Sequence, residues 1–477
     1  MITPSKEEFL ELAGQGNLIP VYCEILADAE TPVSAYQKLH KMGPSFLLES
    51  VEGGEHLGRY SFVGANPREL VRVDRRNGDD PLRRVQHEMA KFKPVTLPGL
   101  RFTGGAVGFL GYEYVHHIEP SVPCPAADEL KTPTLCFMIT DNMLIFDRVS
   151  QTIKVLCNAH VIGNPLKAYE RACEEIRQTL KHLAEPLSGK PVEFQRDPTP
   201  IKFESNMPPA RHAEMIVKAK EYIKAGDIIQ TVLAQRFQAP TSASALDIYR
   251  ALRSVNPSPY MFLLDFGDFQ LVGASPEVHV RCEDRRVEIR PIAGTRWRGK
   301  TPEEDAALEK ELLADEKERA EHLMLVDLAR NDIGRVCDFG SVKVDEFMVV
   351  ERYSHVMHIV SNVTGRLQAD CSTYDLMRAT FPAGTVSGAP KVRAMQIISE
   401  LEATQRGSYA GAVGYFSFNG NLDSCITLRT ALLKDGVAYV QAGGGIVADS
   451  DPAYEFQETV NKAKAMVKAI ALAESFK

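Results

Sequence analysis

Pairs of strand-like segments joined by very short turns are the feature that most constrains how this chain can fold. MFLLDF (261–266) and FQLVGAS (269–275) form one pair, and VHVRCE (278–283) and RRVEIRPIAG (285–294) form another. Turns this short join antiparallel neighbours, because parallel strands need a crossover of a dozen residues or more. The pattern therefore predicts antiparallel sheets in an α+β fold and no strict βαβ alternation.

The 477 residues divide into regions with different patterns of expected helices and strands, which fits two or three domains or one intertwined unit. Residues 1–185 are strand-rich with one helix at 164–184, and residues 186–208 form a linker rich in proline and polar side chains. Residues 209–477 combine helices with strand pairs. Expected helices cover 208–225, 245–254, 302–331, 390–402 and 452–474, and expected strands include 411–418, 423–433 and 437–447.

Composition excludes several classes of protein. The net charge is −8 and no basic run interrupts the sequence, which argues against nucleic-acid binding. The nine cysteines lack CxxC spacing, so no zinc site or redox motif is indicated, and reduced thiols fit the cytoplasm. No apolar run reaches the length of a membrane helix, and the first residues lack signal-peptide features. We therefore expect a cytoplasmic protein without a membrane or nucleic-acid partner.

Two helical segments carry paired carboxylates. Glu318 and Glu321 lie three residues apart, and Glu455, Glu458 and Lys462 share one face of the final helix. Two such pairs can hold one hard cation through oxygen ligands. Solvated helix faces have the same spacing, so the spacing alone leaves both interpretations open.

Small residues mark two candidate anion sites. Gly443–Gly445 end a strand, where glycines let the backbone approach a ligand closely. FPAGTVSGAPK (381–391) opens a helix, and Thr385 or Ser387 can add a hydroxyl to its N-terminus. A flexible turn and a plain helix cap are the alternatives, and the GxxxxGK[ST] spacing of a P-loop is absent.

Isolated charged residues in apolar surroundings complete the candidates. Arg429 is flanked by apolar strand residues, where an arginine usually pairs with an anion. Arg296 and Arg298 suit either an anion or an exposed rim, His358 a site or a core histidine, and Glu277 a site or an isolated turn. Together the candidates describe a site for a small polyanion with a divalent metal. No nucleophile–base dyad, HExxH helix or dinucleotide fingerprint accompanies them.

Six ordered motifs give the chain a resemblance to a known family. They are PIAGTRWRG, AEHLMLVDLARND, FPAGTVSGAPK, GSYAGAVGYFS, CITLRTA and QAGGGIVADSDPAYEFQETVNKA. The set resembles the chorismate-utilising enzymes, most closely the anthranilate synthase large subunits, strongly over residues 205–470 and more loosely before them. The resemblance implies a large sandwich of two antiparallel sheets packed orthogonally with helices outside, in which the linker need not separate independent domains.

The resemblance also gives each motif a role. The implied roles are Mg²⁺ ligation by Glu321 and Glu458 with Glu318 and Glu455 nearby, catalysis by Glu277, His358 and Thr385, and substrate binding by Gly294, Thr295, Tyr409, Arg429, Gly443, Gly444, Gly445 and Lys462. A metal and an arginine suit chorismate, which carries two carboxylates. Loss of the ring hydroxyl needs an acid, and the later loss of pyruvate needs proton transfer.

Two positions favour ammonia addition over related reactions. Relatives that make 4-amino-4-deoxychorismate carry a nucleophilic lysine where this chain has Ala293. Isochorismate and salicylate synthases carry a lysine base where it has Gln230, which takes up no proton at neutral pH. The resemblance therefore implies Mg²⁺-dependent conversion of chorismate and ammonia to anthranilate and pyruvate, through aminodeoxyisochorismate.

A partner and a regulator are implied as well. No glutaminase Cys–His arrangement is present, so ammonia is expected from a separate glutamine amidotransferase subunit in a hetero-oligomer. LLES (47–50) and NPSPYM (256–261) match tryptophan-inhibition motifs, with Glu49, Ser50, Pro259, Tyr260 and Met261 as the pocket. The alternatives are a structural role for these motifs, an aminodeoxychorismate synthase of the folate branch, and a tryptophan-binding regulator without activity.

Overall fold

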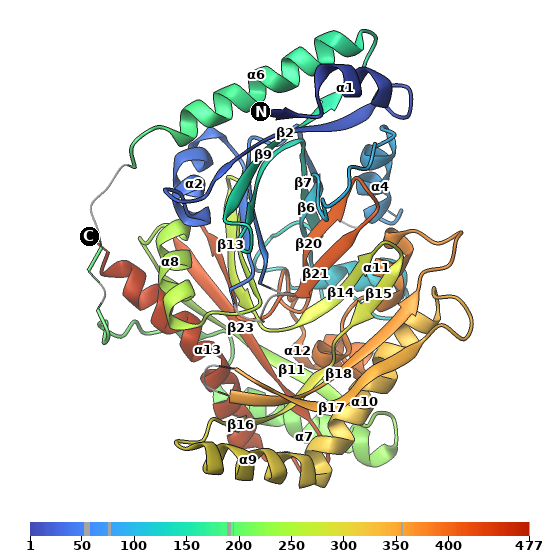
Figure 1. Ribbon diagram of the computed structural model, residues 1–477. Helices are drawn as coiled ribbons and strands as arrows, with labels where there is room; N and C mark the ends of the chain where they lie inside the picture. Colours follow the sequence, from blue (N-terminus) through green and yellow to red (C-terminus); the bar gives the residue numbers. More distant parts are fainter. Residues whose placement is uncertain (52–57, 75–77, 188–191, 194, 354–355, 477) are drawn as a thin grey trace.

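The strands form two antiparallel sheets in the computed structural model, which describes all residues except 52–57, 75–77, 188–191, 194, 354–355 and 477 (Figure 1). In spatial order the larger sheet contains β1 (Ile2–Thr3), β2 (Leu18–Leu26), β9 (Thr152–His160), β8 (Asn142–Asp147), β4 (Tyr60–Ala65), β3 (Ser45–Glu49), β12 (Tyr260–Asp265), β13 (Phe269–Ser275), β22 (Thr430–Lys434), β23 (Val437–Ile446), β11 (Gln230–Pro240) and β10 (Glu204–Ser205), and β19 (Gly388–Ala389) also pairs with β11. The smaller sheet contains β16 (Ile292–Trp297), β18 (Val356–Arg366), β15 (Arg286–Ile289), β14 (Val278–Glu283), β21 (Leu422–Ile426), β20 (Ala412–Ser417), β6 (Gly105–Leu110), β7 (Leu135–Thr140) and β5 (Glu69–Val73), with β17 (Lys343–Arg352) on β18.

Helices cover the outer faces of the sheets (Figure 1). They are α1 (Lys6–Leu12), α2 (Pro32–Leu39), α4 (Leu82–Ala90), α5 (Val115–Ile118), α6 (Pro165–Leu183), α7 (Pro209–Ala225), α8 (Ala245–Val255), α9 (Pro302–Ala314), α10 (Glu316–Gly334), α11 (Thr373–Thr380), α12 (Lys391–Glu402) and α13 (Pro452–Glu474), with short 3₁₀ turns η1 (His40–Met42), η2 (Tyr112–Tyr114) and η3 (Gly384–Val386). Buried aromatic rings fill the space between the sheets, and Phe62 of β4 lies with its ring centre 5.9 Å from that of Tyr415 of β20. The α+β expectation of antiparallel sheets with helices outside is confirmed.

Both sheets contain strands from both ends of the chain. In the larger sheet β3 pairs with β12, and in the smaller sheet β6 pairs with β20. Residues 1–185 and 209–477 therefore share their sheets and core, and the linker expected at 186–208 joins two parts of one unit. Part of that linker lies outside the described residues, and its last part forms β10 on the edge of β11.

Two of the expected elements are wrong, because the structure divides each of them into two separate elements. The single helix expected at 302–331 breaks at Asp315, whose carboxylate accepts the backbone N–H groups of Lys317 and Glu318 and so starts a new helix. The single strand expected at 423–433 is β21 in the smaller sheet and β22 in the larger one. Arg429 lies between them with a φ of 48°, so it is not a strand residue.

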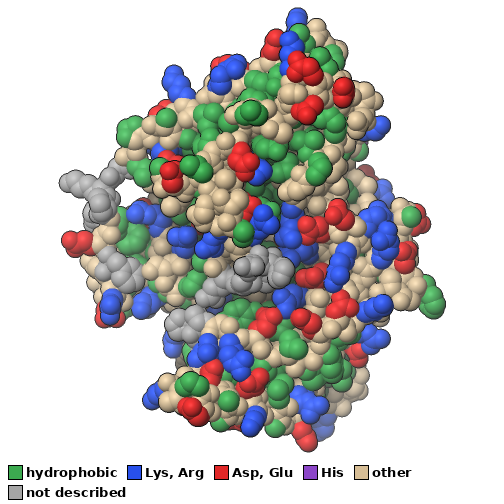
Figure 2. All heavy atoms as spheres, in the orientation of Figure 1, with side chains coloured by type: hydrophobic (Ala, Val, Ile, Leu, Met, Phe, Trp, Pro, Cys, Tyr) green, Lys and Arg blue, Asp and Glu red, His purple; other side chains and the backbone are tan. Residues whose placement is uncertain are grey.

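Charge is unevenly distributed over the surface. Although the net charge is −8, Figure 2 shows lysine and arginine side chains gathered in a band across the middle of one face. In the part of the chain that the structure describes, none of the helices combines the length and apolarity that a membrane crossing requires.

Candidate active site

Arg429 lies where the chain crosses from one sheet to the other, close to Glu277. The backbone leaves β21 at Ile426 and enters β22 at Thr430. Arg429 makes no ion pair with any described residue, and burial lowers its pKa even though Glu277 lies close enough to oppose that shift. A half-buried arginine without a carboxylate partner is available to an anionic ligand.

Glu277 and Thr385 line one small cavity. Burial raises the pKa of Glu277 to about 7, against smaller opposing effects of a hydrogen bond with Thr385 and of the nearby Lys462 and Arg429. Thr385 belongs to η3, within the loop that precedes α12. A carboxyl group that is partly protonated near neutral pH can serve as a general acid.

His358 is held by the PIAGT motif on the neighbouring strand. Its Nδ1 lies 3.0 Å from the Gly294 carbonyl oxygen and 3.1 Å from the Thr295 hydroxyl. Gly294 is the extra residue of a β-bulge between β16 and β18, with a φ of 69° that favours glycine. Burial lowers the pKa of His358, which favours the neutral ring. Donation from Nδ1 to the carbonyl leaves Nε2 as the free proton acceptor.

The triple glycine forms the end of β23, beyond the point where β22 stops pairing at Val440. Gly443–Gly445 pair with β11 on one side, and their other side is free of β22. A Cβ at Gly443 would lie 2.7 Å from the Tyr409 hydroxyl, and the Gly443 carbonyl accepts a hydrogen bond of 3.0 Å from Lys462 Nζ. Larger residues would therefore fill the space beside the tyrosine.

The four carboxylates come together as two pairs beside these glycines. Mutual repulsion adds to burial in raising the pKa of Glu318, which neighbours Glu321, and that of Glu455, which neighbours Glu458. Glu455 Oε2 is buried and has no hydrogen-bond partner among the described residues, which fits a carboxylate oxygen that a cation satisfies. No group of three or more metal-binding side chains is close enough to hold an ion across those residues.

Other contacts connect the pairs to the rest of the site. Gln230 Nε2 donates to Glu321 Oε1 over 3.2 Å, and a Cβ at Gly445 would collide with the same amide. Glu458 forms an ion pair of 2.6 Å with Lys462. Glu277 lies near Thr385, Arg429 and Lys462. Lys462 in turn contacts Glu458 and Gly443, which links these substrate candidates with one of the two carboxylate pairs.

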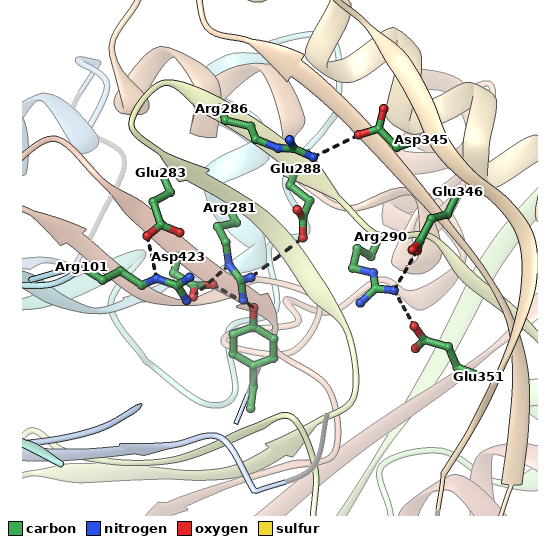
Figure 3. Close-up of polar contacts among 11 residues, drawn as sticks. Arg101, Arg281, Glu283, Arg286, Glu288, Arg290, Asp345, Glu346, Glu351 and Asp423 are labelled. Carbon is green, nitrogen blue, oxygen red and sulfur yellow. Dashed lines mark hydrogen bonds and ion pairs between the residues drawn. The ribbon is translucent and has the colours of Figure 1, made fainter. Parts of the chain in front are cut away.

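Three sequence candidates have structural roles instead. Arg296 pairs with Glu311, Asp315 and Glu318, and Arg298 pairs with Asp305, so both fasten β16 to the helices beside it. The Ser387 hydroxyl donates to the Ala383 carbonyl within its own loop. Arg290, which the sequence did not single out, lines the Glu277 cavity and pairs with Glu346 and Glu351 (Figure 3).

A second pocket lies between the sheets away from this site, and all five residues expected for a tryptophan pocket line it. The Tyr260 hydroxyl donates to Asp423 over 2.8 Å and accepts from Arg281 over 2.9 Å. Arg281 also bonds Asp423 directly (Figure 3). Sequence reasoning missed Arg281 and Asp423, although a charged residue inside the apolar run VHVRC was the available signal.

Comparison with known proteins agrees with this arrangement. The chorismate binding enzyme family matches residues 43–468. Anthranilate synthase component 1 of Acetivibrio thermocellus is 49% identical over 98% of this chain and 99% of its own length, and that of Pseudomonas aeruginosa is 48% identical over the same shares.

Solved structures extend the comparison to the fold. Anthranilate synthase component I from Streptococcus pneumoniae is 39% identical, with a TM-score of 0.77 over 93% of this chain and 99% of that one. The menaquinone-specific isochorismate synthase of Escherichia coli is 19% identical with a TM-score of 0.73 over 97% and 98%, which shows the shared fold alone. The chain therefore belongs to the chorismate binding enzyme family and, within it, to the relatives named anthranilate synthase component 1.

Proposed function

We propose that this chain is an anthranilate synthase large subunit, which converts chorismate and ammonia to anthranilate and pyruvate. The observation that carries the proposal is the proximity of an unpaired Arg429 to Glu277, whose pKa is raised, together with two carboxylate pairs. Chorismate brings two carboxylates and a ring hydroxyl that must leave. An arginine, a cation site and a protonated acid are the groups that this substrate requires.

Each group has a defined task in the proposed reaction. Arg429 and the free edge of Gly443–Gly445 hold the enolpyruvyl carboxylate, with Tyr409 beside them. Glu277 donates the proton with which the ring hydroxyl leaves, and Thr385 orients that carboxyl. His358, with Nδ1 fixed by the Gly294 carbonyl, takes or returns a proton at Nε2 when pyruvate is lost.

Magnesium fits the two carboxylate pairs. Glu321 and Glu458 would hold it, with Glu318 and Glu455 nearby, and the unsatisfied Glu455 Oε2 supports a cation there. Bound Mg²⁺ supplies positive charge to the ring carboxylate. Burial raises the pKa of Glu455, a hydrogen bond with Ser450 opposes that shift, and the neighbouring Glu458 adds to it.

Ammonia is favoured over other nucleophiles by two side chains at the site. Ala293 lies in β16 opposite Ile359 and has no nucleophilic atom. The Gln230 amide donates to Glu321 and cannot remove a proton from water. These residues argue against an aminodeoxychorismate synthase and an isochorismate synthase respectively. The name component 1 of the relatives supports a second subunit, which we propose to be a glutamine amidotransferase that supplies ammonia.

The second pocket is proposed to bind tryptophan as a feedback inhibitor. Glu49, Ser50, Pro259, Tyr260 and Met261 line it together. Glu49 accepts from Tyr249 over 2.6 Å and pairs with Arg253, so its carboxylate has a fixed position in the lining of this pocket.

One assay tests both proposals. The purified chain is mixed with chorismate, Mg²⁺ and an ammonium salt at mildly alkaline pH, and anthranilate fluorescence is followed with and without tryptophan. Emission that depends on chorismate and Mg²⁺ and that tryptophan suppresses is the expected result.

Three other outcomes would contradict the proposal in different ways. Chorismate loss without anthranilate would point to 4-amino or isochorismate products and would overturn the interpretation of Ala293 and Gln230. Anthranilate emission insensitive to tryptophan would contradict the regulatory pocket alone. Tryptophan binding without chorismate loss would favour a regulator without activity.

A further inference from the structure

A buried ion pair lies next to the active site, and its two residues belong to none of the sequence motifs. The side chains of Arg406 and Glu402 are 1% and 2% exposed. Arg406 Nε donates to Glu402 Oε2 over 2.9 Å and Nη2 donates to Oε1 over 2.6 Å, a two-point pairing of guanidinium and carboxylate. Burying two charges is unfavourable unless further hydrogen bonds satisfy them. The other hydrogen-bond partners of Arg406 and Glu402 therefore show which segments the pair holds in place.

One set of partners is the backbone of β11. The short strands β19 and β10 pair only with the two ends of β11, so its middle has no strand on that side. There Arg406 Nη2 donates to the Val232 carbonyl over 2.8 Å, and Glu402 accepts from the Ala234 N–H over 2.9 Å. Val232 and Ala234 are the register partners of the two ends of Gly443–Gly445. The ion pair thus takes the place of a neighbouring strand and fixes the part of β11 that pairs with the triple glycine of β23.

A second set of partners is the loop and the tyrosine on the other walls. Arg406 Nη1 donates over 2.9 Å to the carbonyl of Val386, the residue that follows Thr385. The guanidinium carbon of Arg406 lies 5.5 Å from the centre of the Tyr409 ring. One side chain therefore contacts the segments that present the catalytic hydroxyl, the tyrosine and the glycines.

The backbone of Arg406 is fixed in turn by a buried carboxyl group. Glu113 Oε1 accepts the Arg406 N–H over 2.7 Å and Oε2 accepts the Gly407 N–H over 3.0 Å. Hydrogen bonds thus hold both the backbone of Arg406 and its guanidinium group, and the side chain connects these two fixed points.

We propose that Arg406, together with Glu402, is a positioning residue for the reaction: it sets the relative placement of Thr385, Tyr409 and Gly443–Gly445 and does not touch the substrate. The inference rests on the proposed function. Catalysis is sensitive to small displacements of the reacting groups, because a shift of about 1 Å can lower a rate by about 100-fold. The pair therefore matters more to the rate than to folding.

The double variant Arg406→Met with Glu402→Leu tests this. Replacing both charges by apolar side chains leaves no unpaired ion from this pair. It also removes the partners of the Val232 and Val386 carbonyls and of the Ala234 N–H, so the melting temperature is measured beside kcat. We expect kcat to fall by about 10- to 100-fold, with a smaller rise in KM and in the chorismate dissociation constant measured by calorimetry. Arg406→Lys keeps the charge but lacks the planar fork that reaches several carbonyls, so its kcat is expected to lie between those of the wild type and the double variant.

Arg236→Met is the matched control. Arg236 is also a buried arginine and lies in β11, the strand to which Arg406 donates, but its guanidinium contacts Glu129 and the Gln405 carbonyl instead of the walls of the site. It is expected to change the melting temperature and to leave kcat within about threefold. All variants are compared by chorismate consumption, so that anthranilate formation tests the proposed function separately.

Wild-type kcat and KM in the double variant would overturn the inference. So would a loss of kcat that Arg236→Met reproduces at an equal loss of melting temperature, because the effect would then follow stability. A wild type that consumes chorismate without forming anthranilate would contradict the proposed function and leave this comparison intact. A wild type that consumes no chorismate would contradict both.

Discussion

The two pockets of this molecule treat charge in opposite ways. In the candidate active site, Arg429 has no ion-pair partner among the described residues and Glu277 bonds the Thr385 hydroxyl. In the second pocket, Arg281 and Asp423 satisfy each other and the Tyr260 hydroxyl (Figure 3). Unpaired charge is available to an ionic substrate, whereas paired charge is not. The comparison indicates that the first pocket is organised for anion chemistry, and the second for a ligand held mainly by shape and apolar contact.

The same stretch of chain contributes to both pockets. Asp423 lies in β21 at the second pocket, and Arg429 follows the end of that strand at the active site. A ligand in the second pocket therefore contacts the strand that leads to Arg429. This continuity gives a physical reason to test each pocket with changes that should leave the other alone.

The largest expected effect is that of Glu277→Gln. The amide has the shape of the acid and cannot donate the same proton, so kcat should fall by about 100- to 10,000-fold. Steady-state anthranilate formation measures this, and calorimetry should show unchanged tryptophan binding. A loss below about tenfold would remove Glu277 as the acid and weaken the contrast between the pockets.

Arg429→Gln removes the unpaired charge and should lower kcat/KM by at least about 100-fold, because a ligand carboxylate loses its buried partner. Arg281→Gln is the matched change in the second pocket. It should weaken tryptophan inhibition and leave kcat/KM for chorismate near that of the wild type. If the two variants changed kcat/KM and tryptophan inhibition in the same way, the assignment of separate functions to the two pockets would be wrong.

Ser50→Phe tests the second pocket through volume. A phenyl ring adds atoms to a closely packed site, which typically costs about 1–3 kcal/mol and so should weaken tryptophan inhibition by about 10- to 100-fold. Ser50→Ala removes the hydroxyl without adding volume and should have a smaller effect. Inhibition that survives in Ser50→Phe would place the tryptophan site elsewhere.

The smallest expected effect concerns stability and pH. Burial raises the pKa of Glu277 from the ordinary 4.5 to about 7, so between these values the native chain binds a proton that the unfolded chain releases. The contribution of Glu277 to the stability of the wild type is therefore fully present below pH 4.5, and it is lost as the pH rises through about 7. Glu277→Gln should be more stable than the wild type above pH 7, on the order of 2 kcal/mol, and equally stable near pH 4.

Thermal unfolding of the metal-free chain across this pH range measures the difference. Glu113, whose pKa burial also raises to about 7, is present in both proteins and cancels. A constant difference between the two proteins at all pH values would show that Glu277 titrates normally.

Local pattern predicted many of the elements and the residues of both pockets. The hairpins and the apolar strand with His358 followed from turn length and residue type, and the final helix followed from its spacing. The break at Asp315 did not, because an acidic residue at a helix start looks like one more residue of an acidic helix. Arg296 and Arg298 were equally ambiguous, since their partners at Asp315 and Asp305 come from other elements.

By itself, the sequence determined the family to which the chain belongs and the candidate residues for its chemistry. The motifs name its acids, its arginine and its glycines, and the absence of lysine at Ala293 and Gln230 limits the nucleophile. Only the tertiary structure decided where each charge finds a partner. Arg429 lies between two strands, where the chain crosses from one sheet to the other, and makes no ion pair among the described residues. Arg406, in contrast, forms a buried ion pair with Glu402. Arg429 follows the apolar run CITL and Arg406 lies in the polar stretch ATQRGS, and neither setting shows whether the charge will be paired, because that depends on how folding places the neighbouring groups.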